Sequence, residues 1–62
     1  MWLELTRHGT SEAVWVNTDT VTYILELTDP AGQPGSKLFF AGGTELAVKE
    51  ALDRIIERMQ LA

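Results

Sequence analysis

The residues that could do acid–base or ligand chemistry are few in this sequence, and they are scattered. His8 is the only histidine and follows Arg7 in a polar segment that contains a glycine. An imidazole can bind a metal or transfer a proton, but no cysteine and no second ligand at metal spacing accompanies this one. No serine or cysteine nucleophile pattern surrounds it either. We therefore interpret His8 as a solvated loop residue and Arg7 as a surface base.

Four carboxylates lie close together near the end of the chain, at Glu45, Glu50, Asp53 and Glu57. Paired acids can do acid–base work only where a cleft shifts their pKa values. Their spacing instead suits the polar side of an amphipathic helix, with Glu50 and Arg54 four residues apart in the favourable order. We therefore interpret the four acids as a solvated face.

Gly42 and Gly43 are too short a run for a phosphate-binding loop, and the required Lys-Ser/Thr does not follow them. Two glycines accept the positive φ of a hairpin turn, which explains them fully. We predict no catalytic residue, no cofactor and no metal ligand. The sequence thus favours a protein that is not an enzyme.

Length and net charge limit the kinds of protein that this chain can be. The 62 residues predict one domain spanning 1–62. The chain has no cysteine, so neither a disulfide bond nor a thiolate metal site can stabilise that domain. Nine acids against five bases give a net charge of −4, which argues against a nucleic-acid or anionic-membrane surface. No apolar run approaches the roughly 18 residues of a membrane span, and no basic region opens the chain as in a signal peptide. We expect a cytoplasmic protein.

Alternation of apolar and polar residues predicts five strands, at Trp2–Thr6, Ala13–Val16, Val21–Thr28, Lys37–Ala41 and Glu45–Val48. Asn17 is expected to cap a single helical turn before the third strand. The segment Asp29–Ser36 contains both prolines and is predicted to be a mobile loop outside any strand.

From Val48 onward the apolar spacing changes to that of a helix, with Leu52, Ile55, Ile56 and Met59 on one side. Strands joined by short turns form an antiparallel meander. The predicted fold is mainly β, an antiparallel meander of about five strands with one C-terminal α-helix packed on the sheet. The helix should cover an inner face made of Leu3, Leu5, Val14, Val16, Leu25, Leu38, Phe40 and Leu46.

By parity, the opposite face carries one large apolar residue from each of four strands: Trp2, Trp15, Ile24 and Phe39. An exposed apolar stripe of this kind marks an interface, unless the sheet curls into a small barrel and buries part of it. A small domain without disulfides gains stability by covering such a surface. We predict a homodimer or small oligomer centred on this stripe, and contacts with a further protein partner.

Three segments together resemble the FlbD family of small bacterial flagellar proteins, also called SwrD. They are Leu3–Arg7, Val14–Asp19 leading to Val21 and Ile24, and Phe39–Glu50 before the helix. They match an LTR-like start, a V-N-x-D-x-I-x-x-I centre and a G-x-x-x-x-V-x-E close. The resemblance implies a non-enzymatic accessory protein linked to motility that acts through protein contacts.

Two features depart from this family pattern. Ala51 stands where family members carry a Ser or Thr that caps the helix, and the Asp29–Ser36 segment is longer than the family's usual turn. The Met-x-Leu-x-Leu-Thr-Arg start and the Leu-Ala-Val segment before the helix also resemble the CsrA family of RNA-binding translational regulators. Arg7 matches the first basic residue of that family. Lys49 and Glu50 stand where CsrA proteins have His-Arg, and an acidic chain binds RNA poorly.

Overall fold

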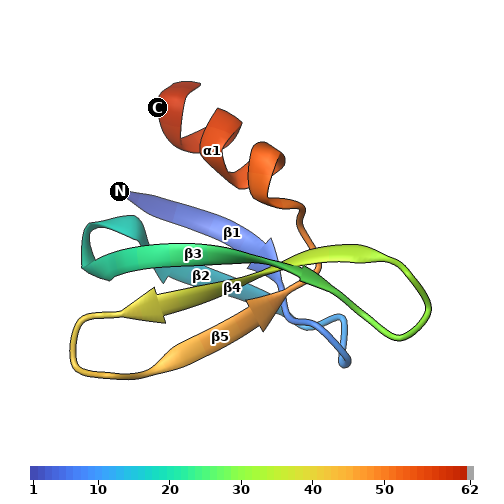
Figure 1. The fold of residues 1–62 in the computed structure, drawn as a ribbon. Helices are drawn as coiled ribbons and strands as arrows, with labels where there is room; N and C mark the ends of the chain where they lie inside the picture. Colours follow the sequence, from blue (N-terminus) through green and yellow to red (C-terminus); the bar gives the residue numbers. More distant parts are fainter. Residues whose placement is uncertain (62) are drawn as a thin grey trace.

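The computed structural model describes residues 1–61 and contains five strands, a short 3₁₀ turn and one C-terminal helix (Figure 1). The strands are β1 (Trp2–Thr6), β2 (Ala13–Asn17), β3 (Val21–Thr28), β4 (Pro34–Phe40) and β5 (Glu45–Val48). The turn η1 (Thr18–Thr20) follows β2, and the helix α1 spans Leu52–Leu61. All strand pairs are antiparallel, which confirms the predicted mainly-β fold with one terminal helix.

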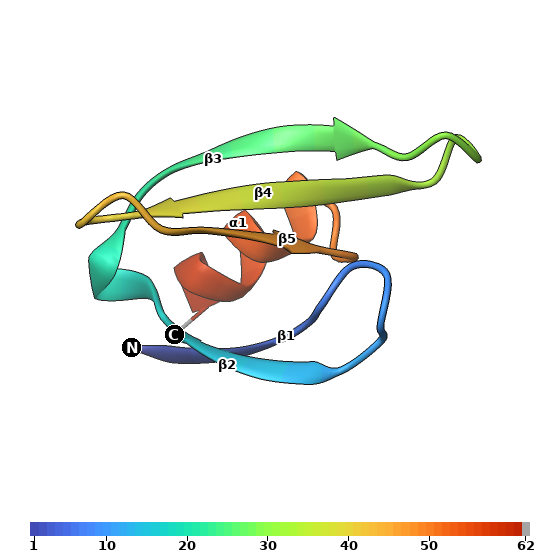
Figure 2. The same cartoon turned by 90° about the horizontal axis from the view of Figure 1, so that it is seen from below.

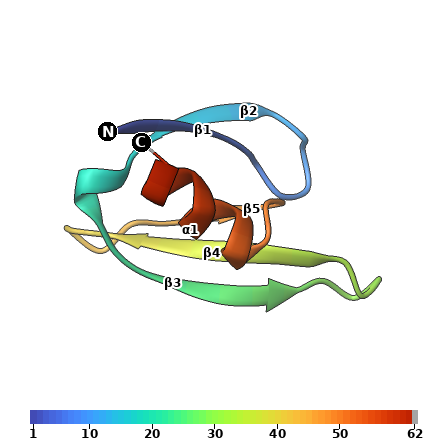
Figure 3. The same cartoon turned by 90° about the horizontal axis from the view of Figure 1, so that it is seen from above.

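The strands form two sheets rather than one continuous sheet. A two-stranded ribbon pairs β1 with β2, and a three-stranded sheet has the order β3–β4–β5. The chain passes from one to the other through η1. Figures 2 and 3 show that the ribbon and the sheet face each other, with α1 filling the space between them on one side.

One end of the ribbon is joined to the sheet by backbone hydrogen bonds. Lys49 N donates to Thr6 O at 2.8 Å, and His8 N donates to Ala47 O at 2.9 Å. These bonds flank a single antiparallel bridge between Arg7 and Val48. These bonds join the ribbon to β5 at this end.

A carboxylate reinforces this junction. The side chain of Glu50 accepts hydrogen bonds from Thr6 N at 2.9 Å and from Thr6 Oγ1 at 2.9 Å, while its backbone O accepts from the buried Ser36 hydroxyl at 2.7 Å. Because α1 begins only at Leu52, Glu50 is not a helix residue and its expected pairing with Arg54 is wrong. Its interpretation as a solvated acid is wrong because its carboxylate accepts the hydrogen bonds from Thr6 and is partly buried.

The core lies between the two sheets and is closed by the helix. Its buried residues are Leu3, Leu5, Val16, Leu38, Val48 and Ile55. Partly buried side chains pack against it from Val21, Ile24, Phe40, Leu46 and Met59. Near the helix C-terminus, Arg58 Nη1 donates to Glu4 O at 3.0 Å and holds α1 against the outer edge of β1. The predicted helix face is confirmed at Ile55 and Met59 and is wrong at Ile56, which is 42% exposed because the helix turns it away from the core.

A bulge changes the face that β3 presents. Val21 pairs with Phe40, but the register shifts before Tyr23, which pairs with Phe39. One extra residue sends every later side chain to the other side of a strand. Leu25 is therefore 52% exposed on the outside, and Ile24 packs against the core. The prediction had these two residues on the opposite faces and is wrong for both.

The fourth strand begins earlier than predicted, at Pro34 rather than Lys37. Proline is tolerated as the first residue of a strand. Gly35 follows it, and a Cβ at this position would lie only 2.8 Å from Val48 O, so glycine permits the close approach of β4 and the end of β5. Residues 34–36 therefore belong to the sheet. The remaining loop is a tight turn in which Gln33 N donates to Asp29 Oδ1 at 2.8 Å.

Candidate protein-interaction surface

The ribbon presents one apolar side to the core and a second, aromatic side to solvent. Leu3 pairs with Val16, and both point inward. Trp2 and Trp15 lie on the outer side, on neighbouring strands, and are 64% and 62% exposed. In an antiparallel pair, large side chains placed diagonally on one side are within reach of each other. We call this outer side the ribbon face; its residues are Trp2, Glu4, Thr6, Ala13, Trp15 and Asn17.

A groove opens beside the ribbon face, between the ribbon and the end of the sheet near η1. Its volume is about 410 Å³. The ribbon contributes the consecutive residues Val14–Asn17, and the sheet contributes Phe40, Thr44 and Leu46 among others. Figure 2 views the molecule from this side, opposite α1. The lining is mainly apolar, and both tryptophans border it.

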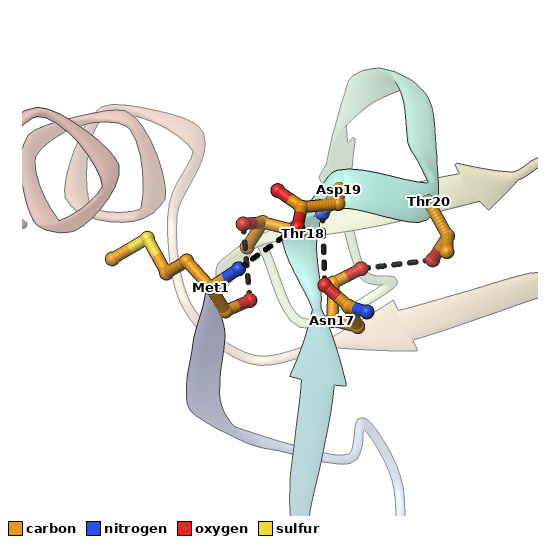
Figure 4. Close-up of polar contacts among 5 residues, drawn as sticks. All are labelled: Met1, Asn17, Thr18, Asp19 and Thr20. Carbon is orange, nitrogen blue, oxygen red and sulfur yellow. Dashed lines mark hydrogen bonds and ion pairs between the residues drawn. The ribbon is translucent and has the colours of Figure 1, made fainter.

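The end of the groove is fixed by the η1 junction (Figure 4). Asn17 Oδ1 accepts from Asp19 N at 3.1 Å, which confirms the predicted cap, and Thr20 Oγ1 donates to Asn17 O at 2.8 Å. Thr18 N donates to Met1 O at 2.9 Å, so the first residue is also held here. The two tryptophans are thus carried on backbone that is hydrogen-bonded at both ends of the ribbon.

The outer face of the sheet has a different character. Tyr23 and Phe39 stack there with ring centroids 4.3 Å apart. Lys37 Nζ lies 5.7 Å from the centre of the Phe39 ring and 3.0 Å from a carboxylate oxygen of Glu45. These side chains contact one another, and Tyr23 is 54% exposed. This outer face of the sheet and the ribbon face lie on opposite sides of the molecule, because the ribbon and the sheet face each other (Figures 2 and 3).

The predicted interface stripe is therefore divided in the structure. Trp2 and Trp15 lie together on the ribbon face, Phe39 lies on the far side of the molecule, and Ile24 packs against the core. The prediction of a single stripe is wrong because it assumed one flat sheet without the bulge in β3. What remains as a candidate surface is the tryptophan pair with its adjacent groove, a feature that strand parity within β1 and β2 could locate.

A polar cluster lies where the loops after β1 and β3 meet. His8 Nε2 is 3.6 Å from Asp29 Oδ2, and Lys49 Nζ contacts Ser11 Oγ. His8 is therefore not simply a solvated loop residue, and its partner could not be found from sequence spacing. The lysine and serine are exposed, so burial does not activate either as a nucleophile. Within residues 1–61, no group of three acidic, histidine or cysteine side chains could hold a metal.

No family model, curated protein or solved structure matches this chain. In the part of the chain that the structure describes, no helix is long and apolar enough to cross a membrane. The basis for a functional proposal is thus the ribbon face and the sequence patterns that surround it.

Proposed function

We propose that this chain is a small non-enzymatic accessory protein that acts through protein–protein contacts made by the ribbon face. The observation that carries this proposal is the pair of exposed tryptophans, Trp2 and Trp15, beside an apolar groove. Tryptophan is enriched among the residues that dominate binding energy at interfaces. A monomer gains nothing from presenting two indoles to water, whereas a partner that covers them gains a large apolar contact.

The cellular setting that we propose is motility, as the FlbD resemblance implies. The structure gives a physical meaning to two residues of that pattern. Thr6, from the LTR-like start, and Glu50, from the V-x-E close, are the hydrogen-bonded partners that join ribbon to sheet. These two residues lie 44 positions apart in the sequence and make one contact. This supports a shared fold, on which the tryptophans of the ribbon face supply the contact surface.

A swimming assay in the source bacterium tests this function. We expect deletion of the gene to reduce spreading in soft agar, and the wild-type gene to restore it. The variant Trp15→Glu should fail to restore spreading because it places a charge at the centre of the proposed contact. The matched control is Leu25→Glu, which introduces the same charge at a residue that is 52% exposed on the opposite face.

The outcomes separate the parts of the proposal. Full spreading without the gene would remove the motility role. Restoration by Trp15→Glu as complete as by the wild type would remove the ribbon face as the contact surface. Thermal melts of both purified variants show whether each is folded. Retention of RNA that declines steeply between two salt concentrations would instead favour the CsrA-like alternative.

A further inference from the structure

The two sheets have four strand edges, and Arg58 and Glu50 bind the edge of β1. The other three edges differ in how they are protected. The β5 edge is bonded to residues 6–8 at one end and carries the charged Glu45 at the other. The β3 edge has a bulge near Tyr23 and the charged Glu26 in its centre. Charges, bulges and covering segments are the means by which proteins keep strand edges from pairing with another chain.

The outer edge of β2 has none of these devices. Its sequence is Ala-Val-Trp-Val-Asn, without charge, proline or glycine, and its pairing with β1 contains no register shift. Across β1 and β2 together the only charged residue is Glu4. In a protein with a net charge of −4, this ribbon is where two copies can approach with the least repulsion.

The hydrogen-bonding phase of the ribbon shows which groups this edge offers. Thr18 N donates to Met1 O and Arg7 N donates to Glu12 O at the two ends of the ladder. Because bonded and non-bonded pairs alternate in an antiparallel ladder, Val14 and Val16 bond to β1. The backbone groups of Ala13, Trp15 and Asn17 therefore point to the open edge, although Asn17 O already accepts from Thr20 Oγ1.

From this edge we infer that β2 pairs antiparallel with β2 of a second copy, with Trp15 on the twofold axis. The inference rests on the proposed function, in which the ribbon face makes the contacts, and it names the partner. The strand is nearly palindromic about Trp15. In the antiparallel pairing, Val14 of one copy is opposite Val16 of the other, and Ala13 is opposite Asn17.

The pairing joins two ribbons into one four-stranded sheet. About four new backbone hydrogen bonds form without the Asn17 carbonyls, and about six form if each Asn17 O accepts a second donor beside Thr20 Oγ1. The two Trp15 side chains lie opposite each other with their Cα atoms about 5.5 Å apart, and a Trp2 lies diagonal to each. The four indoles form one row, and the valines of both copies line the opposite side next to the groove. A twofold interface of this kind uses the same surface on both copies.

Amide hydrogen exchange with sedimentation equilibrium tests the inference on the wild-type chain. We expect a concentration-dependent dimer, in which exchange slows at the amides of Ala13, Trp15 and Asn17 as dimer forms. The amides of Ile24 and Glu26 face the other open edge and should show no change with concentration, because the β4 pairing phase after the bulge leaves them unbonded. A wild type that remains monomeric at high micromolar concentration would overturn the inference.

Two proline variants give the matched comparison. Ala13→Pro removes an edge-facing N–H from β2 without removing a bond to β1, and we expect the dissociation constant to rise by at least about tenfold. Glu26→Pro removes the equivalent group from the β3 edge and should leave the constant unchanged. Exchange data on the wild type decide the matter if either variant fails to fold.

The variants also separate this inference from the proposed function. If Trp15→Glu weakens the dimer but Ala13→Pro does not, and the three β2 amides exchange freely, the copies associate face to face through their indoles. The β2 pairing would then be wrong while the ribbon face remained the contact surface. If the three amides become protected only when another protein is added to a monomeric chain, the β2 edge binds that protein. The inferred pairing with a second copy would then be wrong.

Discussion

The sheet and the ribbon each carry two aromatic side chains on their outer faces, but the surroundings of the two pairs differ. Tyr23 and Phe39 stack on each other, and Lys37 lies over the phenylalanine ring while it pairs with Glu45. Trp2 and Trp15 remain more than 60% exposed next to a groove. Tyr23 is itself 54% exposed, so the stacking of one pair and the groove beside the other distinguish them more than the exposed fraction does. The sheet face contributes to stability, and the ribbon face is available to a partner.

The largest effect should come from removing what holds both regions together. Ile55 is fully buried between ribbon and sheet, and Ile55→Ala should lower the free energy of unfolding by about 2–5 kcal/mol because it leaves a cavity. Urea unfolding measures the loss. The control is Ile56→Ala at the neighbouring, 42% exposed position, which should lose much less. Equal losses would mean that the helix presents a different face to the core.

The next largest effect should come from breaking the junction between ribbon and sheet. Glu50→Ala leaves Thr6 N and Oγ1 without their acceptor, and we expect a loss of about 1.5–3 kcal/mol, typical of hydrogen bonds to a charged group. Glu57→Ala removes an exposed carboxylate of the helix and should change stability by no more than about 0.5 kcal/mol. Thermal unfolding of the two variants is the comparison, and equal stabilities would contradict a structural role for Glu50.

A smaller difference should separate the two aromatic pairs themselves. Phe39→Ala loses a stacked contact and partly buried area, so we expect a cost of about 1–3 kcal/mol. Trp15→Ala should cost less than about 1 kcal/mol when measured at a concentration where the chain is monomeric. The comparison of the faces fails if the monomer depends on Trp15 as strongly as on Phe39.

The smallest effect should be at Leu25, which tests the bulge in β3. Because its side chain is 52% exposed, Leu25→Thr should change the free energy of unfolding by no more than about 0.5 kcal/mol. Ile24→Thr is the control, since that residue packs against the core and should cost clearly more. A larger loss for Leu25→Thr than for Ile24→Thr would mean that β3 has no bulge and that Leu25 faces the core.

Local patterns in the sequence were sufficient for the elements but not for every face. Alternation of apolar and polar residues predicted all five strands, the side chain of Asn17 predicted the capped turn, and the helical spacing predicted that Ile55 is buried. The bulge before Tyr23 has no signature that alternation can detect, so Leu25 and Ile24 were placed on the wrong sides. Strand alternation correctly placed Trp2 and Trp15 on one face because β1 and β2 pair without a register shift.

Contacts between distant residues were the other limit. Glu50 resembles the helix acids around it, and nothing near it in the sequence indicates that Thr6 will be its partner. The same is true of His8 and Asp29. Pro34 was assigned to a loop because proline is rare in strands, although the start of β4 tolerates it. In each case the missing information was tertiary, not local.

The Glu50–Thr6 junction also has a consequence for the order in which the molecule folds. It joins residues that are 44 positions apart, and the Arg58–Glu4 bond spans 54, whereas β3, β4 and β5 are connected by short turns. Closing a long chain segment costs more entropy than closing a hairpin, so non-local contacts form late. We expect the three-stranded sheet to be largely formed in the transition state and the ribbon to dock afterwards. Glu50→Ala should therefore accelerate unfolding and leave the refolding rate almost unchanged.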